Sequence, residues 1–185
     1  FGIRGTPTTL VVDGDGSEVD WFIGYNPPAE NFQAHLEKIL RGENTFKALQ
    51  TAYTANPKDV GVVFRLGLKW SDRSDTAKAQ EKYNEVVALD PEGKAGTFTD
   101  EEDTHITAPC TDFARFEIAA AGFTGAKPDP AAIKAFISDY PKSPLVRTAY
   151  RQMVSYYISR AAKEDADAYF AEFTARFPRS ERAHV

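Results

Sequence analysis

Residues 60–93, VGVVFRLGLKWSDRSDTAKAQEKYNEVVALDPEG, contain the most regular pattern in the chain. Apolar residues recur at helical spacing on both sides of a short polar segment, which predicts two amphipathic helices. Gly67 and Ala79 are small residues inside these helices, so we expect the two helices to approach each other closely. The large residues Trp70 and Tyr83 are then expected in the core of a helical hairpin.

Prolines that follow amphipathic segments divide the chain into repeating units. They stand 34, 50 and 37 residues apart, at Pro57, Pro91, Pro141 and Pro178. The first interval is the tetratricopeptide period, and the positions that define that repeat hold Val63, Leu66, Gly67, Trp70, Ala79, Tyr83 and Pro91. Residues 110–143 and 147–180 keep the same apolar phase more loosely. The chain therefore resembles the tetratricopeptide-repeat superfamily over residues 43–180, as three to four helical pairs.

The second interval is longer than the repeat period, and the excess falls at about residues 94–109. This segment is rich in Gly, Thr, Asp and Glu and predicts an inserted polar loop. From Glu43 onward the chain shows helical periodicity broken by Pro or Gly and no strand signal. We therefore expect an all-α superhelical array over residues 43–185, interrupted by that loop.

The resemblance implies that the array binds peptides or proteins in a concave groove. The first helix of each pair would line this groove, through Phe64, Leu68, Arg115, Ile118, Arg151 and Ser155. Each of these residues is equally compatible with plain packing or with solvated surface. Repeats that clamp a C-terminal carboxylate carry Lys and Asn where this chain has Phe64 and Leu68, so the chain departs from that clamp.

The first 42 residues have a different pattern. Residues 8–12 and 18–23 are β-branched and apolar runs joined by Asp-Gly-Asp-Gly, which predicts a β-hairpin. After Pro27 and Pro28, apolar residues recur at helical spacing as far as Leu40, and Gly42 ends the predicted helix. The segment is thus expected to form a β-β-α unit.

This segment, which begins FGIRGTPTTL, is similar to the C-terminal half of the thioredoxin fold over residues 1–41 and includes the tripeptide Gly5-Thr6-Pro7. The resemblance implies that Pro7 is cis and that the backbone of Thr6 pairs with an extended substrate. The alternative is an ordinary trans proline at the start of an edge strand. The predicted helix before Gly42 could also serve as the first helix of the repeat array, or its apolar stripe could face only the hairpin.

A complete thioredoxin fold also needs a preceding β-α-β unit with a C-x-x-C motif. The chain has a single cysteine, Cys110, and one thiol cannot both attack and resolve a disulfide. We expect either an upstream half outside this sequence or another chain that covers the sheet edge, so a homodimer through that edge is one possibility. Because the chain begins at Phe1, we interpret it as a processed or truncated product.

Composition excludes several function classes. The net charge of -5 disfavours nucleic acid as a partner, and no apolar run is long enough to span a membrane. No cofactor-binding or hydrolase motif is present. Cys110, at the start of a predicted helix, is more simply a small buried residue than a reactive thiol.

The spacing of the acidic residues and histidines does not support a metal site either. A solvated acidic loop is the simpler interpretation of Asp100, Glu101, Glu102, Asp103 and His105, and the Asp13–Ser17 segment has a turn composition without the twelfth-position glutamate of a calcium loop. His35 and His184 have no partner at ligand spacing.

The sequence thus predicts an α+β, mostly α chain with a thioredoxin-like part in residues 1–42 and a helical repeat part in residues 43–185. The predicted function is a protein-interaction module without its own redox centre, whose intact parent performs thiol–disulfide exchange or chaperones clients. The alternative is a non-enzymatic scaffold in which the thioredoxin-like half only caps the array. The repeat ends at 140–144 and 177–180 are similar to those of bacterial envelope proteins, which suggests the periplasm or cell envelope and leaves the cytoplasm open.

Overall fold

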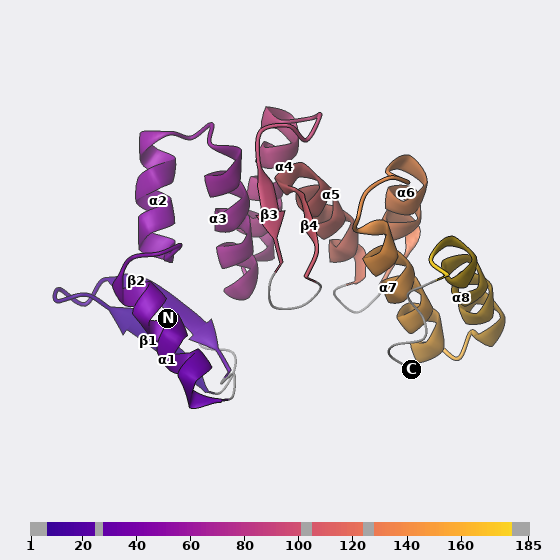
Figure 1. The fold of residues 1–185 in the computed structure, drawn as a ribbon, viewed down its shortest axis with the longest axis horizontal. Coiled ribbons are helices and arrows are strands. Elements are labelled where there is room, and N and C mark those ends of the chain that lie inside the picture. The colour runs from indigo at the N-terminus through magenta and orange to yellow at the C-terminus, as the bar shows by residue number, and fades with distance from the viewer. Residues whose placement is uncertain (1–6, 25–27, 101–104, 124–127, 179–185) are drawn as a thin grey trace. The chain divides into compact units, whose positions relative to one another are not determined.

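The computed structural model of the chain describes residues 7–24, 28–100, 105–123 and 128–178. The chain divides into two compact units, residues 1–89 and residues 90–185. The fold is α+β and mostly α, as expected (Figure 1). The first unit holds the N-terminal hairpin together with four described helices, the last of which ends at Leu89.

The elements of the first unit follow the predicted order. They are β1 (Thr8–Val12), β2 (Glu18–Ile23), α1 (Ala29–Leu40), α2 (Phe46–Ala55), α3 (Val60–Asp72) and α4 (Thr76–Leu89). The two strands pair antiparallel, with Leu10 opposite Trp21, and a register shift lies between Val11 and Val12. In the turn, the backbone N–H of Ser17 donates to the Asp15 carboxylate at 2.8 Å, so the turn interpretation of this segment is confirmed.

Helix α1 contacts the hairpin through aromatic rings. The ring of Phe22 in β2 lies 5.6 Å from the ring of Phe32 and 4.4 Å from that of His35, both in α1. Helix α2 makes its extensive contacts with β2 and α3. The ring contacts of α1 favour the alternative in which its apolar stripe faces the hairpin.

The remaining helices of the first unit form successive hairpins, α2 with α3 and α3 with α4. Helices α2 and α3 bury Phe46, Leu49 and Leu66, and Trp70 packs edge-on against Phe46 at 4.8 Å. Trp70 is only half-buried, so its expected place in the core holds in part. The expected core position of Tyr83 is confirmed, because only 1% of this residue is exposed.

The close approach of α3 and α4 depends on Gly67. A Cβ atom added there would lie 2.5 Å from Cε1 of Tyr83, whose ring is enclosed and cannot withdraw. We expect Gly67→Ala to lower the free energy of unfolding by about 1–2 kcal/mol, because an overpacking cost of about 1–3 kcal/mol exceeds the gain in helix propensity. Urea denaturation monitored by circular dichroism measures the change.

Gly61→Ala in the same helix is the matched control. The nearest atom to its added Cβ is Nη1 of the Arg65 side chain, at 3.0 Å, and that flexible group can move aside. This substitution is expected to stabilise the helix by up to about 1 kcal/mol. Equal effects of the two substitutions would contradict the close packing of α3 on α4.

The second unit contains a small hairpin followed by four α-helices among its described residues. The elements are β3 (Thr97–Thr99), β4 (Thr107–Pro109), α5 (Cys110–Ala120), a 3-10 turn at Ala121–Phe123, α6 (Ala131–Asp139), α7 (Val146–Ser159) and α8 (Lys163–Arg176). Helices α5 and α6 pack together, as do α6 with α7 and α7 with α8. The helical pairs expected over 110–143 and 147–180 are thus present as packed neighbours.

The prediction that the segment from Glu43 onward lacks strands is wrong. Within the expected polar loop 94–109, Thr97 to Thr99 pairs antiparallel with Thr107 to Pro109. Phe98 anchors the hairpin by packing edge-on against Phe113 of α5 at 5.2 Å. Each strand has only three residues, too few for the alternating pattern that signals a strand in a sequence.

Candidate functional site

Pro7, which we expected to contact a substrate, directly precedes β1. It is exposed, and its carbonyl accepts the backbone N–H of Gly24 at 2.8 Å, which closes the open end of the hairpin. Thr6 lies outside the described residues. Among the described residues β1 pairs only with β2, so its other edge carries backbone groups without a strand partner. A strand edge of this kind can accept an extended peptide.

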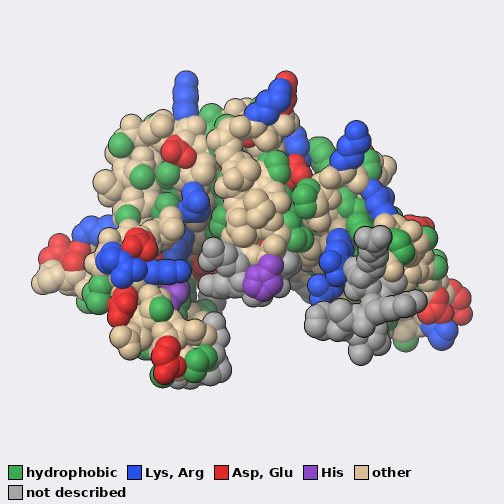
Figure 2. Space-filling view, in the orientation of Figure 1, with side chains coloured by type: hydrophobic (Ala, Val, Ile, Leu, Met, Phe, Trp, Pro, Cys, Tyr) green, Lys and Arg blue, Asp and Glu red, His purple; other side chains and the backbone are tan. Residues whose placement is uncertain are grey.

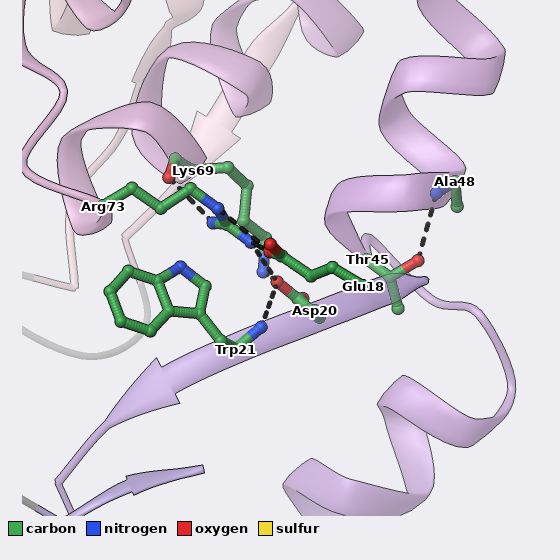
Figure 3. A network of polar contacts seen from close by, with 7 residues as sticks. All are labelled: Glu18, Asp20, Trp21, Thr45, Ala48, Lys69 and Arg73. Carbon is green, nitrogen blue, oxygen red and sulfur yellow. Dashed lines mark hydrogen bonds and ion pairs between the residues drawn. The ribbon is translucent and has the colours of Figure 1, made fainter. Parts of the chain in front are cut away.

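A network of charged side chains fixes this hairpin on α3 (Figure 3). The Asp20 carboxylate in β2 accepts from Lys69 and, at 3.3 Å, from Nη2 of Arg73, while Arg73 also binds Glu18. The backbone N–H of Trp21 donates to Asp20 at 2.9 Å. Only 2% of Asp20 is exposed, so one buried carboxylate joins two cations of the helix to the strand.

Aromatic rings enclose the same network. The Arg73 guanidinium lies 4.0 Å from the centroid of Phe46 and 5.5 Å from that of Trp21, which is itself buried. Arg73 also donates to the carbonyl of Lys69 at 2.9 Å. Nearby, Thr45 caps α2 by accepting the N–H of Ala48 at 3.2 Å (Figure 3). The start of α2 and the end of α3 therefore form one surface that receives β2.

The six residues expected to line a peptide groove have different surroundings. Phe64 is fully buried and packs 6.1 Å from the Tyr83 ring, so its expected groove position is wrong. Leu68 and Ile118 are half-buried. The Arg115 guanidinium donates to the carbonyl of Pro91 at 2.6 Å and lies over a tyrosine ring, so it is held within its own unit. Only two of the six are exposed, and both are in α7: Arg151 and Ser155.

Other candidate groups take structural roles. Cys110 is 1% exposed at the start of α5, in agreement with a buried thiol. Glu101, Glu102, Asp103 and His184 lie outside the described residues. Within the part of the chain that the structure describes, no cluster of three or more His, Cys, Asp or Glu side chains could hold a metal ion. No described helix is long and apolar enough to cross a membrane.

Helix α7 borders two pockets. One, of about 340 Å³, lies against α8 and is mostly apolar, with Val154, Ile158 and Phe170 in its wall. The other, of about 310 Å³, is lined by Phe123, Pro128, Gln152, Ser155, Tyr156, Ser159 and Arg160. Ser155, one of the expected groove residues, thus belongs to a pocket with both polar and apolar lining residues that the sequence pattern did not indicate.

In a comparison with protein-family models, residues 1–40 match a thioredoxin-like domain. The N-terminal segment is therefore thioredoxin-like. No curated protein and no solved structure matches the chain.

Proposed function

We propose that this chain is the interaction part of a thioredoxin-like protein with tetratricopeptide-like helical pairs, and that it binds extended segments of client proteins. The observation that carries the proposal is the edge of β1 that has no strand partner among the described residues, directly after the exposed Pro7 and within the segment that matches a thioredoxin-like domain. The packed pairs α3–α4, α5–α6 and α7–α8 support the second part of the proposal.

In this proposal the intact parent exchanges thiols and disulfides or chaperones its clients. The chain itself supplies binding and no dithiol chemistry, because its only cysteine is buried. A peptide added along β1 would pair with a strand edge that has no neighbouring strand among the described residues, each net hydrogen bond contributing about 1 kcal/mol.

A second candidate function is a scaffold in which the thioredoxin-like segment only caps the helices. The burial of Asp20 and Trp21 against α2 and α3 favours it, because these contacts serve attachment and leave no side chain of the network for a ligand.

The test uses reduced and carboxymethylated α-lactalbumin, a permanently unfolded chain, as the client in isothermal titration. We expect Pro7→Ala to raise the dissociation constant about fivefold, the equivalent of one hydrogen bond, because alanine releases the backbone angle that proline fixes at the start of the edge. Pro57→Ala, at an exposed proline between α2 and α3, is the matched control and should leave binding unchanged.

If the wild-type chain binds and Pro7→Ala binds equally well, the segment at Pro7 is a cap and the scaffold function stands. If the wild-type chain does not bind the unfolded client, the proposed function is wrong.

A further inference from the structure

Helix α7 presents a ridge of four exposed residues, Arg147, Arg151, Ser155 and Ser159, which we name the α7 ridge. Its members are spaced four residues apart, so they lie along one face of the helix. The ridge ends at the pocket of about 310 Å³, because its members Ser155 and Ser159 also line that pocket. Arg160, which follows the helix, lines the same pocket.

The charge of this surface is opposite to that of the chain. On the face shown in Figure 2, Lys and Arg side chains are interspersed with Asp and Glu. Residues 146–160, in contrast, contain three arginines and no acidic residue, in a chain whose net charge is -5. Within the described part of the chain, no carboxylate forms an ion pair with Arg147, Arg151 or Arg160. No described carboxylate therefore competes with a ligand for these three guanidinium groups.

The pocket offers further polar groups. The Arg160 guanidinium stacks on the Tyr156 ring at 4.8 Å, which holds it at the pocket wall. Tyr156 is fixed in turn, because its hydroxyl donates to the carbonyl of Pro128 at 3.2 Å. Oε1 of Gln152 is buried without a hydrogen-bond partner among the described residues, so rotation of its carboxamide would offer an acceptor to a peptide N–H.

We propose that the α7 ridge and this pocket bind an extended acidic peptide in which carboxylate side chains alternate with other residues. Residues four apart on a helix are separated by about 6 Å along its axis. Alternate side chains of an extended peptide point to the same side and repeat at about 6.6 Å. Three successive acidic side chains of such a peptide therefore lie beside Arg147, Arg151 and Ser155, and the third enters the pocket that Ser155 and Arg160 both line.

This inference rests on the proposed role in client binding but places the ligand on α7. The probe is a fluorescein-labelled peptide, GEGEGEG, titrated with the full chain and followed by fluorescence anisotropy. A clustered peptide of the same composition, GGEEEGG, and the uncharged GQGQGQG are the matched ligands. We expect the alternating peptide to bind more tightly than either, with an affinity that falls as salt is added.

Arg147→Gln, Arg151→Gln and Arg160→Gln are each expected to raise the dissociation constant about threefold, as for one exposed ion pair. Arg41→Gln removes the same charge from an exposed arginine of the first unit and should change nothing. Equal binding of GQGQGQG, equal binding of GGEEEGG, or no response to the three α7 substitutions would overturn the proposal, as would tighter binding of an oligothymidylate. Pro7→Ala should leave this peptide's affinity unchanged, which separates a failure here from a failure of the proposed function.

Discussion

Asp20→Ala is expected to lower the free energy of unfolding of the 1–89 unit by about 4 kcal/mol. Removing one partner of a buried ion pair leaves the other without compensation, which costs about 3–5 kcal/mol. Here Lys69 and Arg73 would both lose the Asp20 carboxylate, and the Arg73 side chain is only 9% exposed. Urea denaturation followed by Trp fluorescence reports the change directly, because Trp21 packs beside Arg73.

The control for Asp20→Ala is Glu43→Ala, which removes an exposed carboxylate that pairs with Arg41 in the same unit. Exposed ion pairs contribute little, so the midpoint of the transition should stay nearly unchanged. A small effect of Asp20→Ala, similar to that of the control, would contradict the attachment of β2 to α3 through this network.

A compensated variant distinguishes attachment by charge from attachment by packing. Combining Asp20→Leu with Lys69→Met and Arg73→Leu replaces the network by apolar side chains, a change that is often neutral or stabilising in proteins. We expect this triple variant to recover most of the stability that Asp20→Ala loses. If it does not, the charges position the strand in a way that packing alone cannot replace.

The network also shows where sequence reasoning was sufficient and where it was not. The strands, the turn and the helix at 29–40 could be predicted because their apolar spacing and their Gly and Pro residues are local signals. The partners of Asp20 could not, because Lys69 and Arg73 are about fifty residues away and their spacing in a helix is equally typical of solvated surface. A clue was available in β2, where Glu18 and Asp20 are acidic residues on one face of an otherwise apolar strand.

The groove position expected for Phe64 was wrong for a related reason. Helical periodicity places Phe64 and Leu68 on one stripe of α3 but does not say whether that stripe meets another helix or solvent. Tyr83 occupies the space beside Phe64, so the stripe is core. On α7 the same reasoning selected Arg151 and Ser155, which are exposed. It did not select the pocket residues Gln152 and Arg160, because residues that meet at a pocket near the end of a helix do not follow a periodic pattern.

Asp90→Ala is expected to lower the free energy of unfolding of the 90–185 unit by about 3 kcal/mol. Asp90 is 6% exposed, and its carboxylate accepts the N–H groups of Lys94 and Ala95, each at 2.9 Å, and the hydroxyl of Thr111 at 3.2 Å. These bonds hold the chain that enters the β3–β4 hairpin against the first turn of α5. Alanine leaves the two N–H donors without their acceptor, whereas the Thr111 hydroxyl keeps the backbone carbonyl of residue 90 at 2.8 Å. Hydrogen bonds to charged groups each contribute about 1.5–3 kcal/mol.

The pH dependence of Asp90→Ala gives the second readout. Burial raises the pKa of Asp90, but the donors, first the N–H of Ala95, outweigh burial and hold its pKa below 3.8. The folded state therefore binds fewer protons than the unfolded state, so the contribution of Asp90 is present above 3.8 and is lost as the pH falls through the lower folded pKa. The stability difference between wild type and Asp90→Ala should shrink on acidification. Asp139→Ala, at an exposed aspartate at the end of α6, should change stability by no more than about 0.5 kcal/mol at neutral pH. A difference that grows in acid would mean that Asp90 is held in its protonated form and that the hairpin is fixed by other contacts.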